Sequence, residues 1–303
     1  MPNQATVQKI QEAITDEIFF ALGIARRGFL RRMFGWIFYL PTRRFARIMF
    51  EADVEVEKGG AAGGCRRVLD GLGVQATVRG VENIPSEGPV IILANHPGVY
   101  DSMAFGSCIE RRDFKAIVME TRFYHTLLNI HPNLIYVDAD PSKNMPALRE
   151  AIEHLNKGGI FLQFGSGLIE PDPSIRSVGE EVFNKWSPSL EIMLRKVPQT
   201  KIVPAIASGV LKERFASHPF THLRKDEMDK RRLAEFMQVI QQVIWPKSVK
   251  ANPKISFGKV MTLKSLQQQS AGRRLMETAI NNVRTALAEH LSWINSKNEI
   301  NAG

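Results

Sequence analysis

The sequence predicts an α/β protein in which a single mixed β-sheet is flanked by helices and preceded by an N-terminal basic amphipathic pair of helices. Three observations support this fold class. Short apolar segments rich in β-branched residues recur along the chain and alternate with helical stretches. Two long segments in the second half carry apolar residues at helical spacing. A segment near the N-terminal end combines arginines with aromatic residues.

The predicted strands are short and apolar, and turn residues bound them. Residues 90–94 read Val-Ile-Ile-Leu-Ala, a continuous apolar run that is typical of a strand buried on both faces. Strands are expected at residues 74–79, 90–94, 114–118, 134–137, 160–164, 202–207 and 255–263. These segments predict one sheet, because helical stretches separate them.

Helices that cover the sheet are expected at residues 227–245 and 266–294, where apolar residues recur every three or four positions. The stripe of the first helix comprises Leu233, Phe236, Met237, Ile240 and Ile244. The predicted organisation is an N-terminal helical segment at residues 1–57, an α/β domain at 65–263 and a C-terminal helix that packs on this domain at 264–303. The glycine-alanine stretch at 58–64 is expected to form a flexible joint or loop.

Composition restricts the partners of this chain of 303 residues. The formal net charge of +9 implies an anionic partner, which could be nucleic acid, an anionic membrane or a phosphate-bearing substrate. The two cysteines, Cys65 and Cys108, form no metal-binding spacing and no disulfide framework. We therefore expect a reducing compartment and no metal site.

Residues 18–50 contain seven arginines and no acidic residue, and bulky apolar side chains lie between the arginines. This combination is typical of helices that lie in the plane of a membrane, and Pro41 is expected to divide the segment into two helices. The candidate membrane-binding residues are Arg26, Arg27, Arg31, Arg32, Trp36, Arg43, Arg44 and Arg47. In the alternative interpretation these helices pack on the α/β domain, and the arginines are merely solvated.

The N-terminal residues lack the basic region of a secretory signal, and no apolar run approaches the ~18 residues of a membrane span. We therefore expect a cytoplasmic protein, peripheral on the inner face of the membrane. No nucleic-acid-binding motif is present, and large apolar residues would serve no purpose against phosphates. Nucleic acid is therefore not an expected partner.

A histidine and an aspartate follow the strand predicted at residues 90–94. Asn95 and His96 come directly after it, Pro97 and Gly98 form a turn, and Asp101 begins a predicted helix. A histidine at such a position can act as a general base, and a carboxylate beside it would set its tautomer. The hydroxyl of a substrate would then replace the serine of a catalytic triad, without a covalent enzyme intermediate. In the alternative interpretation the two residues only cap the strand and the helix.

The run Ile-Leu-Ala-Asn-His-Pro, with the aspartate five residues after the histidine, resembles the first motif of the glycerolipid and lysophospholipid acyltransferase superfamily, which includes the 1-acylglycerol-3-phosphate O-acyltransferases. The resemblance covers roughly residues 73–263. Residues 73–89 resemble the entry strand, 147–167 lead to the third motif, and 202–206 resemble the fourth.

This resemblance implies a membrane-associated O-acyltransferase that moves a fatty acyl group from acyl-CoA or acyl-carrier protein to a lipid hydroxyl. His96 would be the base and Asp101 its partner, and no cofactor or metal would be needed. The resemblance adds weight to the membrane interpretation, because similar enzymes carry an N-terminal helical pair that meets the bilayer. The implied substrate-binding residues are Asn95, Phe164, Gly165, Ser166, Gly167 and Pro204.

Two positions depart from the pattern of this family. Ala139 stands where the second motif has an arginine that holds the phosphate of the acceptor, and Ser166 stands where the third motif has a glutamate. We therefore expect weaker selectivity for a phosphorylated acceptor. The cations that could substitute are Lys143, Arg149 and Arg176, although each could equally be a solvent-facing charge. Glu170 could supply a carboxylate by a different route.

Two rival functions remain open. Gly165-Ser166-Gly167 could belong to an esterase or lipase-like hydrolase, but a nucleophile elbow has glycines two positions before and after the serine, where this chain has Phe164 and Leu168. A non-catalytic membrane-binding relative could also have kept His96 and Asp101. The remaining histidines show no metal-binding spacing on a shared face.

Overall fold

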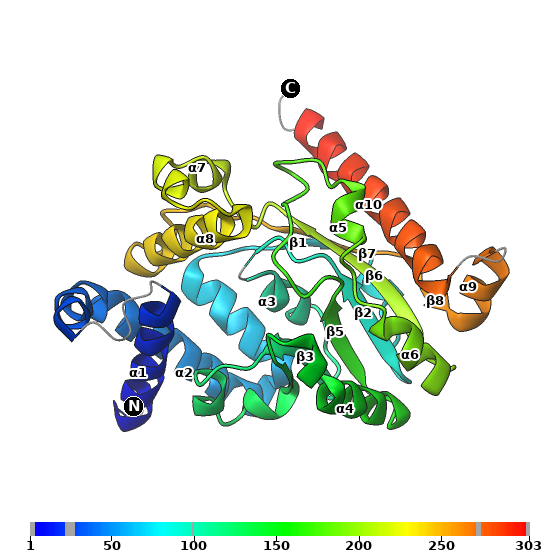
Figure 1. Cartoon of the computed structure of the whole chain (residues 1–303), viewed down its shortest axis with the longest axis horizontal. Coiled ribbons are helices and arrows are strands. Elements are labelled where there is room, and N and C mark those ends of the chain that lie inside the picture. The colour runs from blue at the N-terminus through cyan, green and yellow to red at the C-terminus, as the bar shows by residue number, and fades with distance from the viewer. Residues whose placement is uncertain (1–3, 22–27, 99, 271–273, 301–303) are drawn as a thin grey trace.

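The computed structural model describes residues 4–21, 28–98, 100–270 and 274–300, and it contains one mixed β-sheet with helices on both faces (Figure 1). The predicted fold class is therefore confirmed. The order of the strands along the sheet is β1-β7-β6-β2-β5-β3-β4, and β8 also pairs with β6. The strands are β1 (Thr77–Arg79), β2 (Val90–Ala94), β3 (Phe114–Met119), β4 (Leu134–Val137), β5 (Ile160–Phe164), β6 (Lys201–Ser208), β7 (Lys254–Phe257) and β8 (Met261–Thr262).

Helices cover both faces of this sheet. One apolar core lies beneath α1 (Gln4–Ala21), α2 (Gly28–Leu72), α3 (Asp101–Gly106), α7 (Glu213–Ala216) and α8 (Glu227–Ile244). A second core lies beneath α4 (Met145–Asn156), α5 (Glu180–Phe183), α6 (Ser189–Lys196), α9 (Leu263–Ser270) and α10 (Leu275–Ile300). Short 3₁₀ turns lie at η1 (Val81–Asn83), η2 (Tyr124–Thr126), η3 (His131–Asn133), η4 (Pro141–Lys143) and η5 (Pro219–Leu223).

Strand β2 lies in the middle of the sheet and runs parallel to both of its neighbours, β5 and β6. Ala94, its last residue, pairs with Phe164 at the end of β5 and with Ala205 of β6. Ligands of open α/β sheets bind beyond the carboxyl ends of central strands. The residues that follow β2 and β5 therefore occupy the position at which function is expected.

Most of the predicted strands agree with the structure to within a residue or two. The segment predicted at 255–263 is instead divided, because β7 ends at Phe257 and Gly258 donates its N–H to the Pro204 carbonyl at 2.7 Å. The helix predicted at 266–294 is likewise divided into α9 and α10. Strand β7 is antiparallel to β6, which makes the sheet mixed.

The stretch at 58–64, predicted to be a flexible joint or loop, contains a joint at Gly60 but no loop. This stretch lies within α2, which is interrupted at one residue, Gly60, whose φ of 65° favours glycine. The chain reverses there, and the two helical arms pack against each other. A Cβ on Gly64 would lie 2.4 Å from Val56 Cγ2, and a Cβ on Gly71 would lie 2.7 Å from Ile48 Cγ2. The glycines therefore permit close contact between the arms.

The expected break at Pro41 is wrong, because α2 continues through this residue. A proline removes one helical N–H, and side chains supply nearby polar contacts. Thr42 Oγ1 donates to the Phe38 carbonyl at 2.7 Å, and Gln11 of α1 donates to the Tyr39 carbonyl at 3.1 Å. Packing against α1 thus supports the helix around its proline.

The apolar stripe predicted for α8 is not its most buried face. The stripe residues are half-buried, and Phe236 packs against Phe38 of α2 with ring centroids 5.9 Å apart. The buried residues of α8 are instead Ala234, Glu235, Gln238, Gln242 and Val243. This polar face lies on the core side, where Gln238 donates to the Val210 carbonyl at 2.8 Å.

No helix in the described part of the chain is long and apolar enough to cross a membrane.

Candidate active site

The turn after β2 brings His96 and Asp101 together. His96 Nδ1 lies 2.8 Å from Asp101 Oδ2, and the Gly98 N–H donates to the same oxygen at 3.0 Å. Asp101 is 0% exposed and is the first residue of α3. The carboxylate therefore fixes the ring through one nitrogen while the backbone of the turn fixes the carboxylate.

The other ring nitrogen, Nε2, is available to accept a proton. No described residue bonds to His96 Nε2, and 21% of the side chain is exposed. The ring stacks on Phe164 with centroids 4.1 Å apart and planes inclined by 13°. Burial by itself lowers the pKa of His96, but the charge and hydrogen bond of Asp101, together with the charges of Glu235 and Glu170, outweigh burial and raise this pKa above its usual value. With Nδ1 facing a carboxylate, neutral His96 can accept a proton at Nε2.

Asn95 is buried, and its side-chain amide forms two hydrogen bonds with β6. Its Nδ2 donates to the Ala207 carbonyl at 2.9 Å, and its Oδ1 accepts from the Ala207 N–H at 2.8 Å. The side chain thus extends the pairing of β2 with β6 by one residue and holds the strand end in place. Its contact with a substrate stays a prediction.

Glu170 occupies the space beside His96. Its Oε1 accepts from Ser166 Oγ at 2.6 Å and from Trp186 Nε1 at 2.9 Å, while its backbone N–H donates to the His96 carbonyl at 2.7 Å. Burial raises the pKa of Glu170, although these hydrogen bonds oppose the rise. The chain therefore places a carboxylate next to the first motif through Glu170, four residues after Ser166.

The segment after β5 depends on its glycines. Gly165 donates its N–H to the Ala94 carbonyl at 2.9 Å, and a Cβ on Gly165 would lie 2.0 Å from the Trp186 ring. Gly167 has a φ of 66°. Phe164, Gly165 and Ser166 are thus brought to His96 by packing and by hydrogen bonds.

Pro204 is not brought to this group. It is buried in β6, and a Cβ on Gly258 would meet both Pro204 Cγ at 2.9 Å and Ala286 Cβ of α10 at 3.2 Å. Pro204 therefore faces the layer of α10, whereas His96 and Phe164 pack beside α3.

Ser166 does not contact a histidine among the described residues, since its hydroxyl donates to Glu170 and accepts from the Leu168 N–H at 3.2 Å. The two cysteines offer no nucleophile either, because burial raises the pKa of Cys65 to about 12 and also raises the pKa of Cys108. The described residues contain no group of three or more metal-ligating side chains. His96 thus stands as the candidate base of this site.

The sequence did not indicate two residues of α8 that lie near the site. Glu235 is buried, and its carboxylate has no described hydrogen-bond partner. Burial raises the pKa of Glu235 to about 8, although the charge of His96 opposes the rise. Arg231 Nη1 donates to the Ile169 carbonyl at 3.4 Å. Polar residues at positions 235, 238 and 242 share a helical face, and this spacing was the available signal.

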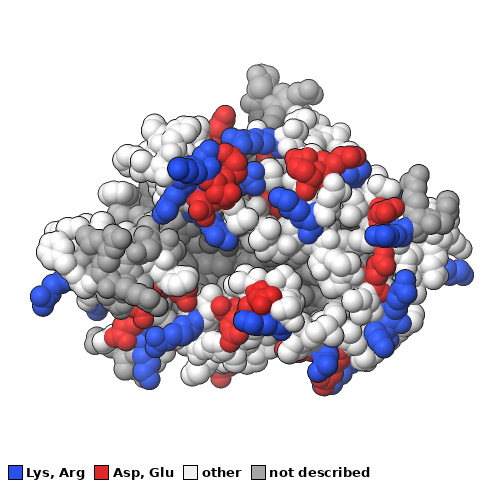
Figure 2. Space-filling view, viewed as in Figure 1, with Lys and Arg blue, Asp and Glu red and all other residues white. Residues whose placement is uncertain are grey.

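The cations considered as substitutes for the missing arginine are mostly engaged elsewhere. Lys143 lies 3.9 Å from Asp138, and Arg176 lies 3.5 Å from Glu227. Arg149 is exposed on α4. Burial lowers the pKa of Arg231, and the neighbouring Arg176 lowers it further. Figure 2 shows basic and acidic side chains gathered over α8, beside a hollow near the centre of this face.

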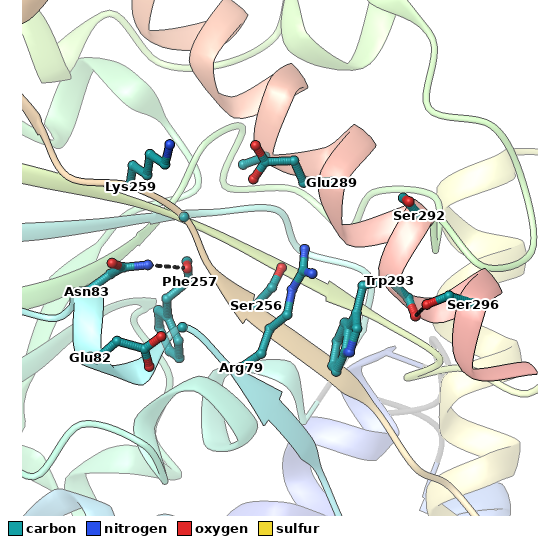
Figure 3. A pocket seen from close by; sticks show the side chains of 13 residues that line it. Arg79, Glu82, Asn83, Ser256, Phe257, Lys259, Glu289, Ser292, Trp293 and Ser296 are labelled. Atoms are coloured by element: carbon teal, nitrogen blue, oxygen red, sulfur yellow. Dashed lines mark hydrogen bonds between the residues drawn. The ribbon is translucent and has the colours of Figure 1, made fainter. Parts of the chain in front are cut away.

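A separate cavity of about 620 Å³ lies between β1, β7 and α10. Figure 3 shows the Arg79 side chain extending between Ser256 and Trp293, with Lys259 and Glu289 at the other end of the cavity. The Arg79 guanidinium lies 4.9 Å from the centroid of the Trp293 ring. Its lining residues include neither member of the His96–Asp101 pair, so this cavity is distinct from the candidate site.

His290 contacts Ser256, which lines this cavity, and its role is structural. It is 0% exposed, with Ser256 Oγ 2.7 Å from Nδ1 and Ser208 Oγ 2.8 Å from Nε2. Burial and the charge of Arg79 lower the pKa of His290 to about 4. A histidine with this pKa is neutral at physiological pH and is a weak base. The three side chains therefore hold α10 against β6 and β7.

Residues 75–208, which include the His96–Asp101 pair, match the family model described as Acyltransferase. This match identifies residues 75–208 as an acyltransferase domain, and the protein is an acyltransferase. The expectation that the protein is an acyltransferase is therefore confirmed, whereas the roles of His96 and Asp101 stay predictions.

Among solved structures, the chain is similar to the crystal structure of the 1-acyl-sn-glycerophosphate (LPA) acyltransferase PlsC from Thermotoga maritima. The two share 17% identity over 95% of each chain, with a TM-score of 0.48. No curated protein matches the chain.

Proposed function

We propose that this acyltransferase is a lipid O-acyltransferase in which His96 is the general base. His96 Nε2 takes the proton of an acceptor hydroxyl while the hydroxyl oxygen attacks the carbonyl carbon of an acyl thioester. A carbon–oxygen bond forms, the carbon–sulfur bond breaks, and the proton passes from His96 to the departing thiolate. The thioester belongs to acyl-CoA or acyl-carrier protein, and the products are an ester and a free thiol.

The observation that carries the proposal is the 2.8 Å contact of His96 Nδ1 with Asp101 Oδ2. Asp101 holds the ring in the tautomer that leaves Nε2 as an acceptor, and it stabilises the imidazolium that forms during attack. A positioned base of this kind contributes about 10²–10⁴-fold to a rate. The proposal needs no metal and no covalent intermediate with the enzyme.

The proposed acceptor is a lipid hydroxyl whose phosphate contributes little to recognition. Ala139 offers no cation where an arginine is usual in the family, and Arg176 and Lys143 have acidic neighbours of their own. A neutral, zwitterionic or amino-lipid acceptor is therefore preferred over lysophosphatidic acid. A preference for a phosphorylated acceptor of ~100-fold in kcat/KM, about 2.7 kcal/mol, would show instead that another cation holds the phosphate.

The proposed location is the inner face of an anionic membrane, with the N-terminal helices in its plane. Phe29 and Trp36 of α2 are 79% and 84% exposed, and Ile37 and Leu40 are also exposed. Apolar side chains of this size are costly to leave in water, whereas the interface of a bilayer accommodates them.

The candidate arginines of this surface differ in their surroundings. Arg32 and Arg47 are exposed, Arg43 Nη1 donates to the Tyr39 hydroxyl at 2.7 Å, and Arg44 Nη1 donates to the Ile244 carbonyl at 2.6 Å. Arg26, Arg27 and the side chain of Arg31 lie outside the described residues. Arg32 and Arg47 are thus the described arginines best able to meet lipid headgroups.

The decisive experiment compares the wild type with His96→Ala, and with His222→Ala as a control at an exposed histidine. Each protein receives palmitoyl-CoA with a panel of lysophospholipids and diacylglycerol, and mass spectrometry detects the acylated product. His96→Ala should lose at least about 100-fold in kcat, while the control stays near the wild type. Wild-type turnover by the His96→Ala variant would refute the assignment, and thiol release that does not depend on an acceptor would indicate a hydrolase.

A further inference from the structure

Glu235 of α8 is a buried acid that the proposed mechanism does not use. Its side chain is 96% removed from solvent, since only 4% remains exposed. Among the described residues, three buried carboxylate oxygens lack a hydrogen-bond donor: Asp101 Oδ1 and both oxygens of Glu235. Buried polar atoms without a partner are rare in folded proteins, and each calls for a physical explanation.

The turn at Gly98 connects the two acids. The Gly98 N–H donates to Asp101 Oδ2 at 3.0 Å, and a Cβ on Gly98 would lie 3.6 Å from Glu235 Oε1. The same Cβ would lie 2.6 Å from Val210 Cγ1. Glu235 therefore reaches the turn that Asp101 closes.

The charges around Glu235 decide which form it takes. Asp101 and His96, in and after the turn that follows β2, face the Glu235 carboxyl, and Tyr100 lies beside them. Arg231 and Arg232 lie on the same helix as Glu235. A second unpaired carboxylate next to Asp101 would be costly in a buried site. A neutral acid can instead donate its proton, and the unpaired Asp101 Oδ1 is an acceptor that lacks a donor. The pKa of about 8 for Glu235 agrees with a neutral acid at physiological pH.

We propose that Glu235 is a positioning residue that stays protonated at neutral pH and donates a hydrogen bond to Asp101 Oδ1, directly or through one water. This bond leaves Asp101 Oδ2 free to hold His96. The inference rests on the proposed function of His96 and Asp101, and Glu235 acts only through Asp101. Loss of the proton would remove the donor and add a negative charge beside Asp101, so the site should lose activity above about pH 8.

Two substitutions separate this role from simple packing. Glu235→Gln keeps an N–H donor at every pH, whereas Glu235→Leu keeps the bulk and has no donor. Asp229→Asn, an exposed acid on the same helix, is the matched control. Two readouts are taken between pH 5 and 10. One is kcat/KM with palmitoyl-CoA and the acceptor that the wild type uses, and the other is the ¹⁵N chemical shift of the His96 ring.

In the wild type and in Asp229→Asn, the His96 resonance should show a second inflection near pH 8, and kcat/KM should fall over the same range. Glu235→Gln should lack both features while it keeps wild-type kcat/KM at pH 7 within about 3-fold. Glu235→Leu should lose about 10–100-fold at pH 7, because a hydrogen bond to a charged group is removed.

The inference is overturned if Glu235→Gln retains the inflection near pH 8, if Glu235→Leu behaves as the wild type, or if Glu235→Gln is inactive because the ionised form is required. Failure of the proposed function is separate, since it would appear as full activity of His96→Ala. The resonance of His96, identified by its disappearance in His96→Ala, reports on Glu235 whichever way that activity falls.

Discussion

Replacement of His290 by leucine should destabilise the protein by an amount that depends on pH. At pH 7.5 the variant leaves the hydroxyls of Ser208 and Ser256 buried without the partner that they have in the wild type, at 2.8 and 2.7 Å. Each unsatisfied hydroxyl costs about 1–3 kcal/mol. The free energy of unfolding should therefore fall by about 2–6 kcal/mol at this pH.

The pKa of His290 predicts how this loss changes in acid. The folded protein holds the ring at a pKa of about 4, whereas an unfolded histidine has a pKa of about 6.5. Below pH 6.5 the unfolded chain therefore binds a proton that the folded protein does not bind. Wild-type stability falls by about 1.36 kcal/mol per pH unit until pH 4 is reached, which amounts to about 2 kcal/mol at pH 5. His290→Leu has no such loss.

Denaturant unfolding of both proteins at pH 7.5 and pH 5 measures this difference. The gap between the wild type and His290→Leu should shrink by about 2 kcal/mol at pH 5, and other titrating groups cancel because both proteins contain them. Ser208→Ala removes one hydrogen bond without removing the titrating ring, so its cost should stay nearly constant. A gap of equal size at both pH values would refute the assignment of His290 as a buried neutral residue.

Asp101→Asn should lower kcat by about 10²–10⁴-fold because the ring tautomer is no longer set, and an unchanged kcat would contradict the role of the aspartate. Gly165→Ala should lower the free energy of unfolding by about 1–3 kcal/mol, because its Cβ would lie 2.0 Å from the Trp186 ring, whose Nε1 donates to Glu170. Calorimetry measures this effect, and an unchanged melting temperature would contradict the packing described. Trp36→Ser should weaken sedimentation with anionic vesicles, more so at high salt, whereas Ile192→Ser on α6 should not. Equal sedimentation of these two variants would reject the membrane surface.

The local sequence alone determined the strands and the turn that carries the candidate site. Residues 90–94 are apolar at every position, so they form a strand only where both faces are covered, which is the centre of the sheet. His96 and Asp101 are five residues apart across a turn, and a short chain of that length admits few geometries. Their contact could therefore be predicted without knowledge of the rest of the fold.

Only the tertiary structure decided what surrounds that pair. Helix α2 passes through Pro41, because contacts with α1 outweigh the local preference for a break there. The chain reverses instead at Gly60, where the two arms of α2 can pack closely against each other. Propensity and hydrophobic period do not include such contacts.

The same limit applies to Glu170 and Glu235, which contact the turn after β2 although they lie 74 and about 140 residues after it in the sequence. The apolar period of α8 pointed to Phe236 and its neighbours, yet the helix turned its polar face inward because Val210 and Leu72 offered backbone carbonyls there. The spacing of residues 235, 238 and 242 indicates a polar face in the sequence, but it does not identify the distant segments that folding brings against this face. The identity of these neighbours therefore depends on the packed chain.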